Sequence, residues 1–286
     1  MADTAFEGFR DWVGRRREEH DTITEWPVRA MHATLDREAG SPAPGDELPP
    51  AWHWLYFLEA RPASQIARDG HPERGDFLPP VPLPRRMWAG GRIEWRQPLR
   101  VGDRAARLSE IVSVEPKSGR TGTLVFVTVR HTISTAAGVS IVEEHDIVYR
   151  EAARPGDPVP AARPGPAGAP WTRTLVPDEV MLFRYSALTF NGHRIHYDTP
   201  YVTGIEGYPG LIVHGPLQAT LLLDLAQAHC PAGLRLTRFE YRALSPTFGG
   251  LPLAVNGQPT DDGRSAQVWA AGPSGGQTMA GTVSYG

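Results

Sequence analysis

The chain has 286 residues, of which 41% are hydrophobic and 21% are charged, and its formal net charge is −3. These values are typical of a globular protein and exclude a disordered chain. The small negative charge gives no general attraction to nucleic acid or to an anionic membrane surface, so we expect neither as a partner.

The same composition bears on the compartment. No apolar run approaches the ~20 residues that are needed to cross a bilayer. The first residues lack the apolar core of a secretory signal. Cys230 is the single cysteine, which excludes an internal disulfide and fits a reducing compartment. We therefore expect a cytoplasmic protein.

The first half, residues 1–150, is predicted to form an α+β unit. Apolar residues at helical spacing predict short helices over residues 6–13 and 26–37, and a Pro-rich loop follows residue 59. Runs rich in Val, Ile and aromatic residues then predict antiparallel strands at 86–99, 104–115, 121–135 and 138–150. A series of strands beside a helix is typical of a sheet that wraps the helix.

Residues 151–172 separate this half from the next. They are dominated by Pro, Ala and Gly and have no apolar periodicity. A segment of this kind cannot form a core element, so it predicts a linker between two domains of ordinary size. The second domain would then span residues 173–286.

The second half repeats the order of the first. Residues 180–190 indicate a strand, and residues 214–229 predict a helix that is apolar nearly all round and therefore buried. Four strands are predicted after it, at 235–244, 251–258, 265–272 and 277–286. A buried helix wrapped by an antiparallel sheet is the hot-dog arrangement. Two such units in one chain predict a double hot-dog fold of the α+β class.

Titratable residues are concentrated immediately before the predicted buried helix. The chain has ten histidines, and His193, His196 and His214 lie within 22 residues of one another. Such groups beside an apolar helix are typical of a site where a substrate meets positioned side chains.

This stretch resembles the hydratase motif of MaoC-like enzymes, Asp-x-Asn-Pro-aliphatic-His followed by His-Gly at the start of the hot-dog helix. NGHRIH lies on the motif, with Asn191 at the Asp position and His196 at the catalytic His position, and His214 and Gly215 form the His-Gly pair. The segment SALTFNGHRIHYD followed by YPGLIVHGPL resembles the corresponding sequence of mesaconyl-C4-CoA hydratases and type 2 hydroxyacyl-thioester dehydratases. The strong match covers residues 183–222, and PLPRRMWAGGRIEW extends it weakly into the first half.

The resemblance implies reversible addition of water across the α,β double bond of an enoyl-CoA. His196, with an ordinary pKa of ~6.5, would be the general base. Asn191 would hold the water, because an amide has no titratable group near neutral pH. The backbone N–H of Gly215, at a helix N-terminus, would bind the enolate oxygen. The expected substrate is a short, branched dicarboxylic acyl-CoA of the mesaconyl or itaconyl kind, with no cofactor or metal beyond the CoA of the substrate.

Several side chains near the motif are predicted to bind this substrate: Arg184, Arg194, Tyr208 and His214. Guanidinium groups suit carboxylates and phosphates, so the same reasoning extends to other arginines, although solvation at the surface is the default for each. These further candidates are Arg85, Arg86 and Arg242.

Other interpretations of the same residues stay open. Asn191 could be a turn residue, His214 could pack under the loop, and the three histidines could form a zinc site. A hot-dog thioesterase could use Glu206 or Asp198 as its base. The chain could also be a dehydratase for acyl-carrier-protein substrates, or a non-catalytic acyl-CoA-binding subunit.

The motif occurs once in the chain. The first half contains no second copy of Asn-x-His-x-x-His or of His-Gly-Pro-Leu. This predicts one active site per chain, with a first half that has lost its catalytic residues and encloses the acyl group. A homo-oligomer is compatible with the sequence.

Overall fold

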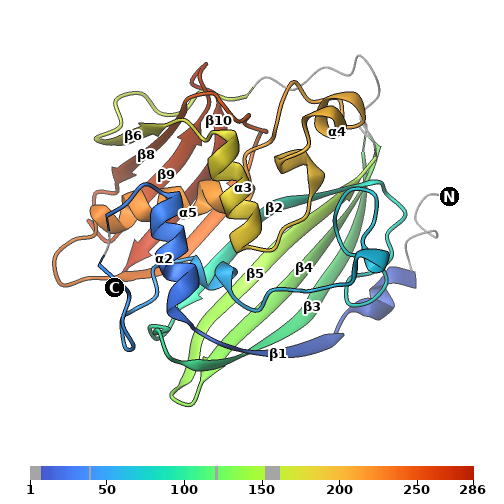
Figure 1. Cartoon of the computed structure of the whole chain (residues 1–286). Coiled ribbons are helices and arrows are strands. Elements are labelled where there is room, and N and C mark those ends of the chain that lie inside the picture. Colours follow the sequence, from blue (N-terminus) through green and yellow to red (C-terminus); the bar gives the residue numbers. More distant parts are fainter. Residues whose placement is uncertain (1–7, 39, 120–121, 152–161) are drawn as a thin grey trace.

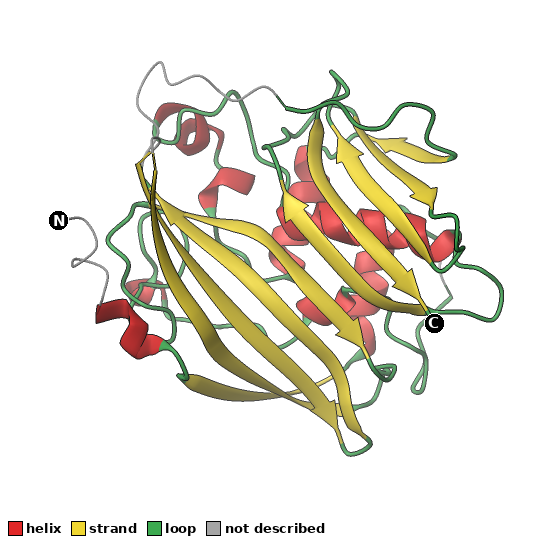
Figure 2. Cartoon of the chain, turned by 180° about the vertical axis from the view of Figure 1, so that it is seen from behind, coloured by secondary structure: helices red, strands yellow, loops and turns green. Residues whose placement is uncertain are grey.

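One antiparallel sheet runs through the whole protein. The computed structural model describes residues 8–38, 40–119, 122–151 and 162–286. Ten strands lie in the order β1-β3-β4-β5-β2-β7-β10-β9-β8-β6. The α-helices pack against one face of this sheet, while the other face is open (Figures 1 and 2). The predicted α+β class is confirmed.

The first half supplies five strands, and four of them are the predicted ones. They are β1 (Arg16–Thr22), β2 (Arg85–Trp95), β3 (Arg104–Gly119), β4 (Gly122–Thr135) and β5 (Gly138–Arg150). The helices of this half are short: η1 (Gly8–Trp12), α2 (Glu25–Thr34), η2 (Trp52–Leu55) and η3 (Ala63–Gln65). The helix expected over residues 6–13 is thus the short 3-10 helix η1, with residues 6 and 7 outside the described part. The edge strand β1 was not predicted.

The second half begins with β6 (Trp171–Leu175), so the predicted linker 151–172 is too long at its end. Its residues 152–161 lie outside the described residues. The elements that follow are α3 (Glu179–Leu188), η4 (Arg194–His196), α4 (Thr199–Gly204), α5 (Gly215–Ala228), β7 (Leu236–Ala243), β8 (Leu253–Pro259), β9 (Ser265–Ala271) and β10 (Gln277–Tyr285). The strand predicted at 180–190 is therefore wrong, because these residues form α3, which the Asp178 side chain caps by accepting from the Met181 N–H at 2.8 Å.

Strand β2 joins the two halves. It pairs with β5 on one side and with β7 on the other, where Gly90 to Glu94 are in register with Arg242 to Arg238. The buried helix α5 packs on β8, β9 and β10. One hydrophobic core extends through both halves, from Ile93 of β2 to Leu222 of α5. Within the described residues, no helix is long and apolar enough to cross a membrane.

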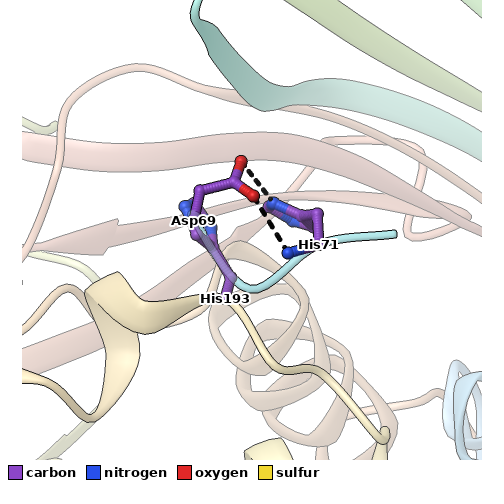
Figure 3. A group of neighbouring side chains, drawn as sticks. All are labelled: Asp69, His71 and His193. Carbon is purple, nitrogen blue, oxygen red and sulfur yellow. Dashed lines mark hydrogen bonds and ion pairs between the residues drawn. The ribbon is translucent and has the colours of Figure 1, made fainter. Parts of the chain in front are cut away.

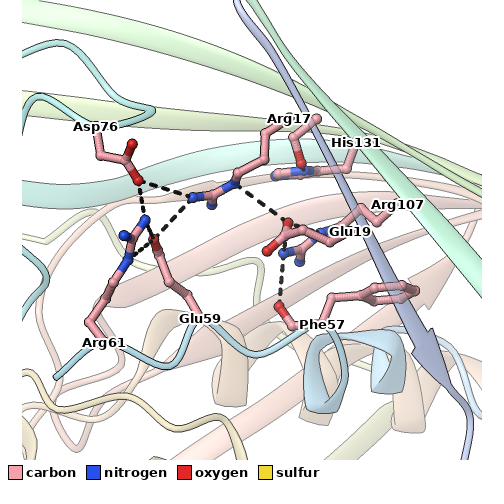
Figure 4. Close-up of polar contacts among 9 residues, drawn as sticks. Arg17, Glu19, Phe57, Glu59, Arg61, Asp76, Arg107 and His131 are labelled. Carbon is pink, nitrogen blue, oxygen red and sulfur yellow. Dashed lines mark hydrogen bonds and ion pairs between the residues drawn. The ribbon is translucent and has the colours of Figure 1, made fainter.

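Ion pairs fix the long loop between η2 and β2 to the edge of the sheet (Figure 4). Arg107 of β3 donates to Glu19 of β1 at 2.6 Å and to the Phe57 carbonyl at 2.8 Å. Arg17 donates to Glu59 at 3.0 Å. Because side chains of β1 and β3 bind the start of the loop at Phe57 and Glu59, the loop leaves the edge of the sheet along a defined path.

Candidate active site

The loop after α3 carries the predicted motif, and Asn191 shapes it. The Oδ1 atom of Asn191 accepts a hydrogen bond from the His193 N–H at 3.0 Å, which makes an Asx turn. The Asn191 N–H donates to the Ser186 carbonyl at 2.8 Å. The alternative that Asn191 is a turn residue therefore holds for its oxygen. Its amide nitrogen stays available for the predicted contact with a water.

His196 lies in η4 and is 7% exposed. Its Nδ1 atom is 2.8 Å from the Ile212 carbonyl oxygen, which can only accept, so the ring carries its proton on Nδ1. Nε2 is then an unprotonated acceptor. Burial lowers the pKa of His196 to about 4, although the bond to Ile212 opposes this. The residue is thus a neutral base at pH 7 rather than one half-protonated near ~6.5.

Four imidazole rings form a row through the site. The ring centres are 4.1 Å apart between His71 and His193, 5.5 Å between His193 and His196, and 3.6 Å between His196 and His214. Burial lowers the pKa of each, to about 4 for His71 and to about 2 for His193. The whole row is therefore uncharged at neutral pH.

His214 lies behind the base. It has no exposed surface, its ring stacks on His196 at an interplanar angle of 20°, and its Nε2 atom is 2.8 Å from the Ser186 hydroxyl. The interpretation that it packs under the loop fits this position better than the predicted contact with substrate. The stacking of His196 on His214, with one nitrogen of each ring bound to Ile212 and Ser186, does not favour the three-histidine zinc site.

Gly215 is the first residue of α5, directly after His214. The first N–H groups of a helix have no partner within the helix, so its backbone can serve as the predicted donor. A Cβ atom at this position would lie 3.2 Å from the Trp88 ring of β2. The glycine thus allows β2 of the first half to approach the start of α5 closely.

The first half contributes residues that the sequence did not single out. Asp69 and His71 lie on the loop before β2 and face His193 (Figure 3). The carboxylate of Asp69 lies 3.1 Å from Nδ1 of His71 and accepts from the His71 N–H at 3.0 Å. Burial alone would raise the pKa of Asp69, but its bonds to His71 outweigh this and lower it. The site therefore holds one carboxylate beside the row of neutral imidazoles.

Two glycines let this loop meet the motif backbone to backbone. A Cβ atom on Gly70, whose φ is +92°, would lie 1.8 Å from the Gly192 carbonyl oxygen. The Arg194 N–H donates to the Asp69 carbonyl at 2.9 Å. The expectation that the first half only encloses the acyl group is thus too narrow, because its loop forms one wall of the site.

Asp69, His71 and His193 also offer metal-ligand atoms within 4.8 Å of one another. No metal is implied by the motif, and the direct contact between Asp69 and His71 accounts for their arrangement. We therefore interpret this group as a hydrogen-bonded wall of the site.

The remaining predicted residues are mostly engaged with the protein itself. Arg194 donates to Asp198 at 2.7 Å and to the Arg68 carbonyl at 3.2 Å, so it braces the loop. Arg184 is exposed on α3 and reaches the Ala33 carbonyl at 3.4 Å. These contacts favour a structural role for both arginines over the predicted contact with substrate.

Tyr208 and the two acidic candidates lie beside α4. The Arg85 guanidinium lies 5.3 Å from the centre of the Tyr208 ring and forms an ion pair with Glu206 at 3.2 Å. Asp198 caps α4 through the Tyr201 N–H. Both acids proposed for a thioesterase are therefore engaged in ion pairs, which does not favour either as a free base.

A pocket of about 510 Å³ opens beside Asp69 and His71. Its wall contains three arginines, Arg68, Arg74 and Arg86, together with Tyr201 of α4. A second hollow, of about 500 Å³, lies among Arg92, Glu240 and Arg242 on the opposite face of the sheet. The first pocket borders the histidine row, so it is the candidate entrance for a substrate, whereas Arg242 is remote from the site.

Comparison with known proteins identifies the family of the chain. The family described as hydroxyacyl-thioester dehydratase type 2 matches residues 51–249. The chain is 47% identical over 278 residues to the mesaconyl-C(4)-CoA hydratase of Chloroflexus aurantiacus, which covers 96% of this chain and 97% of the relative.

Solved structures show the same fold. A MaoC-like dehydratase superposes with a TM-score of 0.71 over 97% of this chain and 98% of its own, at 16% identity. A double hot-dog protein of Mycobacterium tuberculosis gives a TM-score of 0.60 over 96% of both chains, at 15% identity. The predicted double hot-dog architecture is thereby confirmed.

Proposed function

Because the chain belongs to the type 2 hydroxyacyl-thioester dehydratase family of MaoC-like, double hot-dog proteins, we propose that it hydrates a short, branched dicarboxylic enoyl-CoA. The reaction is reversible, so the enzyme is a hydro-lyase in either direction. The relative with 47% identity is a mesaconyl-C(4)-CoA hydratase, which supports a substrate of the mesaconyl or itaconyl kind.

One observation carries the chemistry. The Ile212 carbonyl holds the Nδ1–H of His196, and this leaves Nε2 as a buried, unprotonated base at the start of α5. A base that is neutral at working pH and fixed in one tautomer is what abstraction of a proton from water requires. The sequence predicted this role for His196 from the motif alone.

In the proposed mechanism, His196 takes a proton from water while the water oxygen forms a bond to Cβ. The π electrons of the double bond move toward the thioester carbonyl, whose oxygen becomes an enolate. The imidazolium then returns the proton to Cα, and the C=O bond re-forms. Buried surroundings that lower the pKa of His196 favour this return, because they destabilise the charged ring.

Two groups support these steps. The amide nitrogen of Asn191 holds the attacking water, since its oxygen is already used in the turn. The N–H of Gly215 donates to the enolate oxygen, where the helix dipole also favours negative charge. CoA forms part of the substrate, and the mechanism needs no further cofactor. The protein would act in the cytoplasm, because its single cysteine fits a reducing compartment.

A substrate panel tests the function. Purified protein is mixed with mesaconyl-C4-CoA, crotonyl-CoA, crotonyl-acyl-carrier protein and butyryl-CoA, while enoyl-thioester absorbance and free thiol are both followed. Loss of absorbance without thiol release is expected for the enoyl-CoA substrates. Thiol release would instead identify a thioesterase, and binding without turnover would identify a non-catalytic subunit.

A further inference from the structure

Arg86 of β2 has no carboxylate partner in the described part of the chain. Arg85 pairs with Glu206, and Arg74 donates to three backbone carbonyls between Val81 and Pro84. Among the residues that the structure describes, no carboxylate forms an ion pair with Arg86, although this side chain is partly buried. A partly buried charge without a counter-charge is costly, so its position needs an explanation.

The guanidinium points into the protein, toward the active site. Arg86 of β2 is directly opposite Tyr149 of β5, and residues opposite each other in an antiparallel pair share a face of the sheet. Tyr149 is fully buried on the inner face. Arg86 lines the pocket together with His71, and only two ring-to-ring steps separate His71 from the base His196.

The pocket around Arg86 carries more positive than negative charge, because Arg68, Arg74 and Arg86 line it with the carboxylates Asp69 and Glu73. His71 and His193 are uncharged, for burial lowers the pKa of both and the charge of Arg86 lowers each further. Of the two carboxylates, Asp69 is bound to His71, and Glu73 forms no ion pair with Arg86 among the described residues. Burial raises the pKa of the Tyr149 phenol, and its contact with the Arg86 guanidinium opposes that rise. The pocket thus presents the N–H donors of Arg86 to an anionic group that enters it.

We infer that Arg86 binds the free carboxylate of the substrate and so selects dicarboxylic over monocarboxylic enoyl-CoA. This inference rests on the proposed hydratase function. A planar guanidinium donates two parallel hydrogen bonds to a carboxylate.

The chemistry of the substrate fits this position. Mesaconate is methylfumarate, so in its C4 thioester the free carboxylate is bonded to the β carbon, the atom that the water attacks. An anchor for that carboxylate must therefore lie close to the base, as the pocket at His71 does. The positive charge also offsets the repulsion between the carboxylate and the incoming water oxygen.

The test compares two substrates in one variant. In Arg86→Met, kcat/KM for mesaconyl-C4-CoA should fall about 100-fold, the usual scale for losing a charge-assisted pair, while crotonyl-CoA should keep its wild-type rate. Arg86→Lys keeps the positive charge but loses the planar pair of N–H donors, so its kcat/KM for mesaconyl-C4-CoA should lie between those of wild type and Arg86→Met. Arg92→Met is the matched control, since Arg92 is on the same strand but binds Glu144 and Asp146 on the outer face.

Each other outcome has a separate meaning. An equal loss for both substrates would overturn the inference, because it indicates a contact with the CoA phosphates or an effect on the histidine row. No loss for either would also overturn it. If wild type hydrates crotonyl-CoA without any preference for the dicarboxylic substrate, the hydratase function stands and the role of Arg86 fails.

Binding provides a readout that does not depend on turnover. Wild type should bind succinyl-CoA more tightly than butyryl-CoA in a calorimetric titration, and Arg86→Met should lose that difference. If wild type hydrates no substrate but shows this difference, the proposed function fails while the carboxylate site stands. Equal affinities of wild type for succinyl-CoA and butyryl-CoA would contradict the proposed carboxylate site.

Discussion

The proposed chemistry depends on the imidazole of His196. Changing His196 to alanine should reduce kcat by ~10²–10⁴-fold, the usual cost of losing a general base. The neighbouring His214 has no exposed surface and cannot replace it. Crotonyl-CoA hydration measures the loss, and thermal unfolding checks the fold. His20→Ala on the exposed edge strand should match wild type. A folded His196→Ala enzyme with near-normal kcat would assign proton transfer to another group.

The pH dependence of turnover tests the same base and its neighbour Asn191. Because burial lowers the pKa of His196 to about 4, the acid limb of the kcat/KM profile should lie near that pH. Each assay should be short and started with enzyme that is stored at neutral pH. Asn191→Asp keeps the acceptor of the turn, and its carboxylate would raise the pKa of His196 by favouring the charged ring. The limb should then move to higher pH. An unchanged limb in a folded, active variant would place Asn191 away from the base.

The sequence alone predicts only some of the residues that form the site. The spacing within NGHRIH marks Asn191 and His196 because their contacts are local to one loop. Asp69 and His71 lie far earlier in the chain. The short sequence Asp-Gly-His does not predict which distant segment these residues contact. Their contact with His193 depends on the path of the loop, which ion pairs at Arg17 fix.

The loop that bears Asp69 and the loop that bears the motif act as one element. In Gly70→Ala, the new Cβ would meet the Gly192 carbonyl at 1.8 Å at a φ of +92°, so the two loops must separate. We expect a loss of kcat of more than about tenfold and a stability loss of about 2 kcal/mol or more. Hydration rate and urea unfolding measure these.

Gly75→Ala is the matched control for this substitution. Gly75 has a similar φ of +101°, but its nearest neighbour is Pro80 at 3.7 Å. It should therefore lose stability through backbone strain while keeping its turnover. Equal turnover in the two variants would show that the contact between the loops does not position the motif.

The elements that the sequence predicted well are those with a strong apolar pattern. Helix α5 and strands β2 to β5 bury their pattern in the core, so local periodicity and tertiary structure agree. The failures are α3 and β1. Residues 180–190 are apolar without clear periodicity, and the Asp178 cap favours a helix over a strand. Strand β1 has charged residues throughout and is held by cross-strand pairs such as Arg16–Glu110, which no apolar pattern predicts.

The whole molecule is expected to be sensitive to mild acid. Burial lowers the pKa of many of its histidines, to about 3 for His131 and to about 4 for His71 and His196. The unfolded chain then binds more protons below pH ~6.5, so stability is full above that pH and falls as the pH drops toward the folded values. Each such histidine contributes about 1.4 kcal/mol per pH unit.

Urea unfolding at several pH values between neutral and mildly acidic checks this expectation. The transition midpoint should move to lower urea with each step toward acid. His131→Gln removes one histidine whose pKa burial lowers, and should make the dependence shallower. A midpoint that does not change over this range would contradict the neutral state of the buried histidines.

The pairing of β2 with β7 has a consequence for the behaviour of the enzyme on dilution. The pocket wall at Arg86 and His71 belongs to one half and the base His196 to the other, yet a single chain holds both. The two walls meet at an effective concentration that no dilution of the protein can lower. Specific activity should therefore stay constant from micromolar to picomolar enzyme, and a fall on dilution would show that a second chain completes the site.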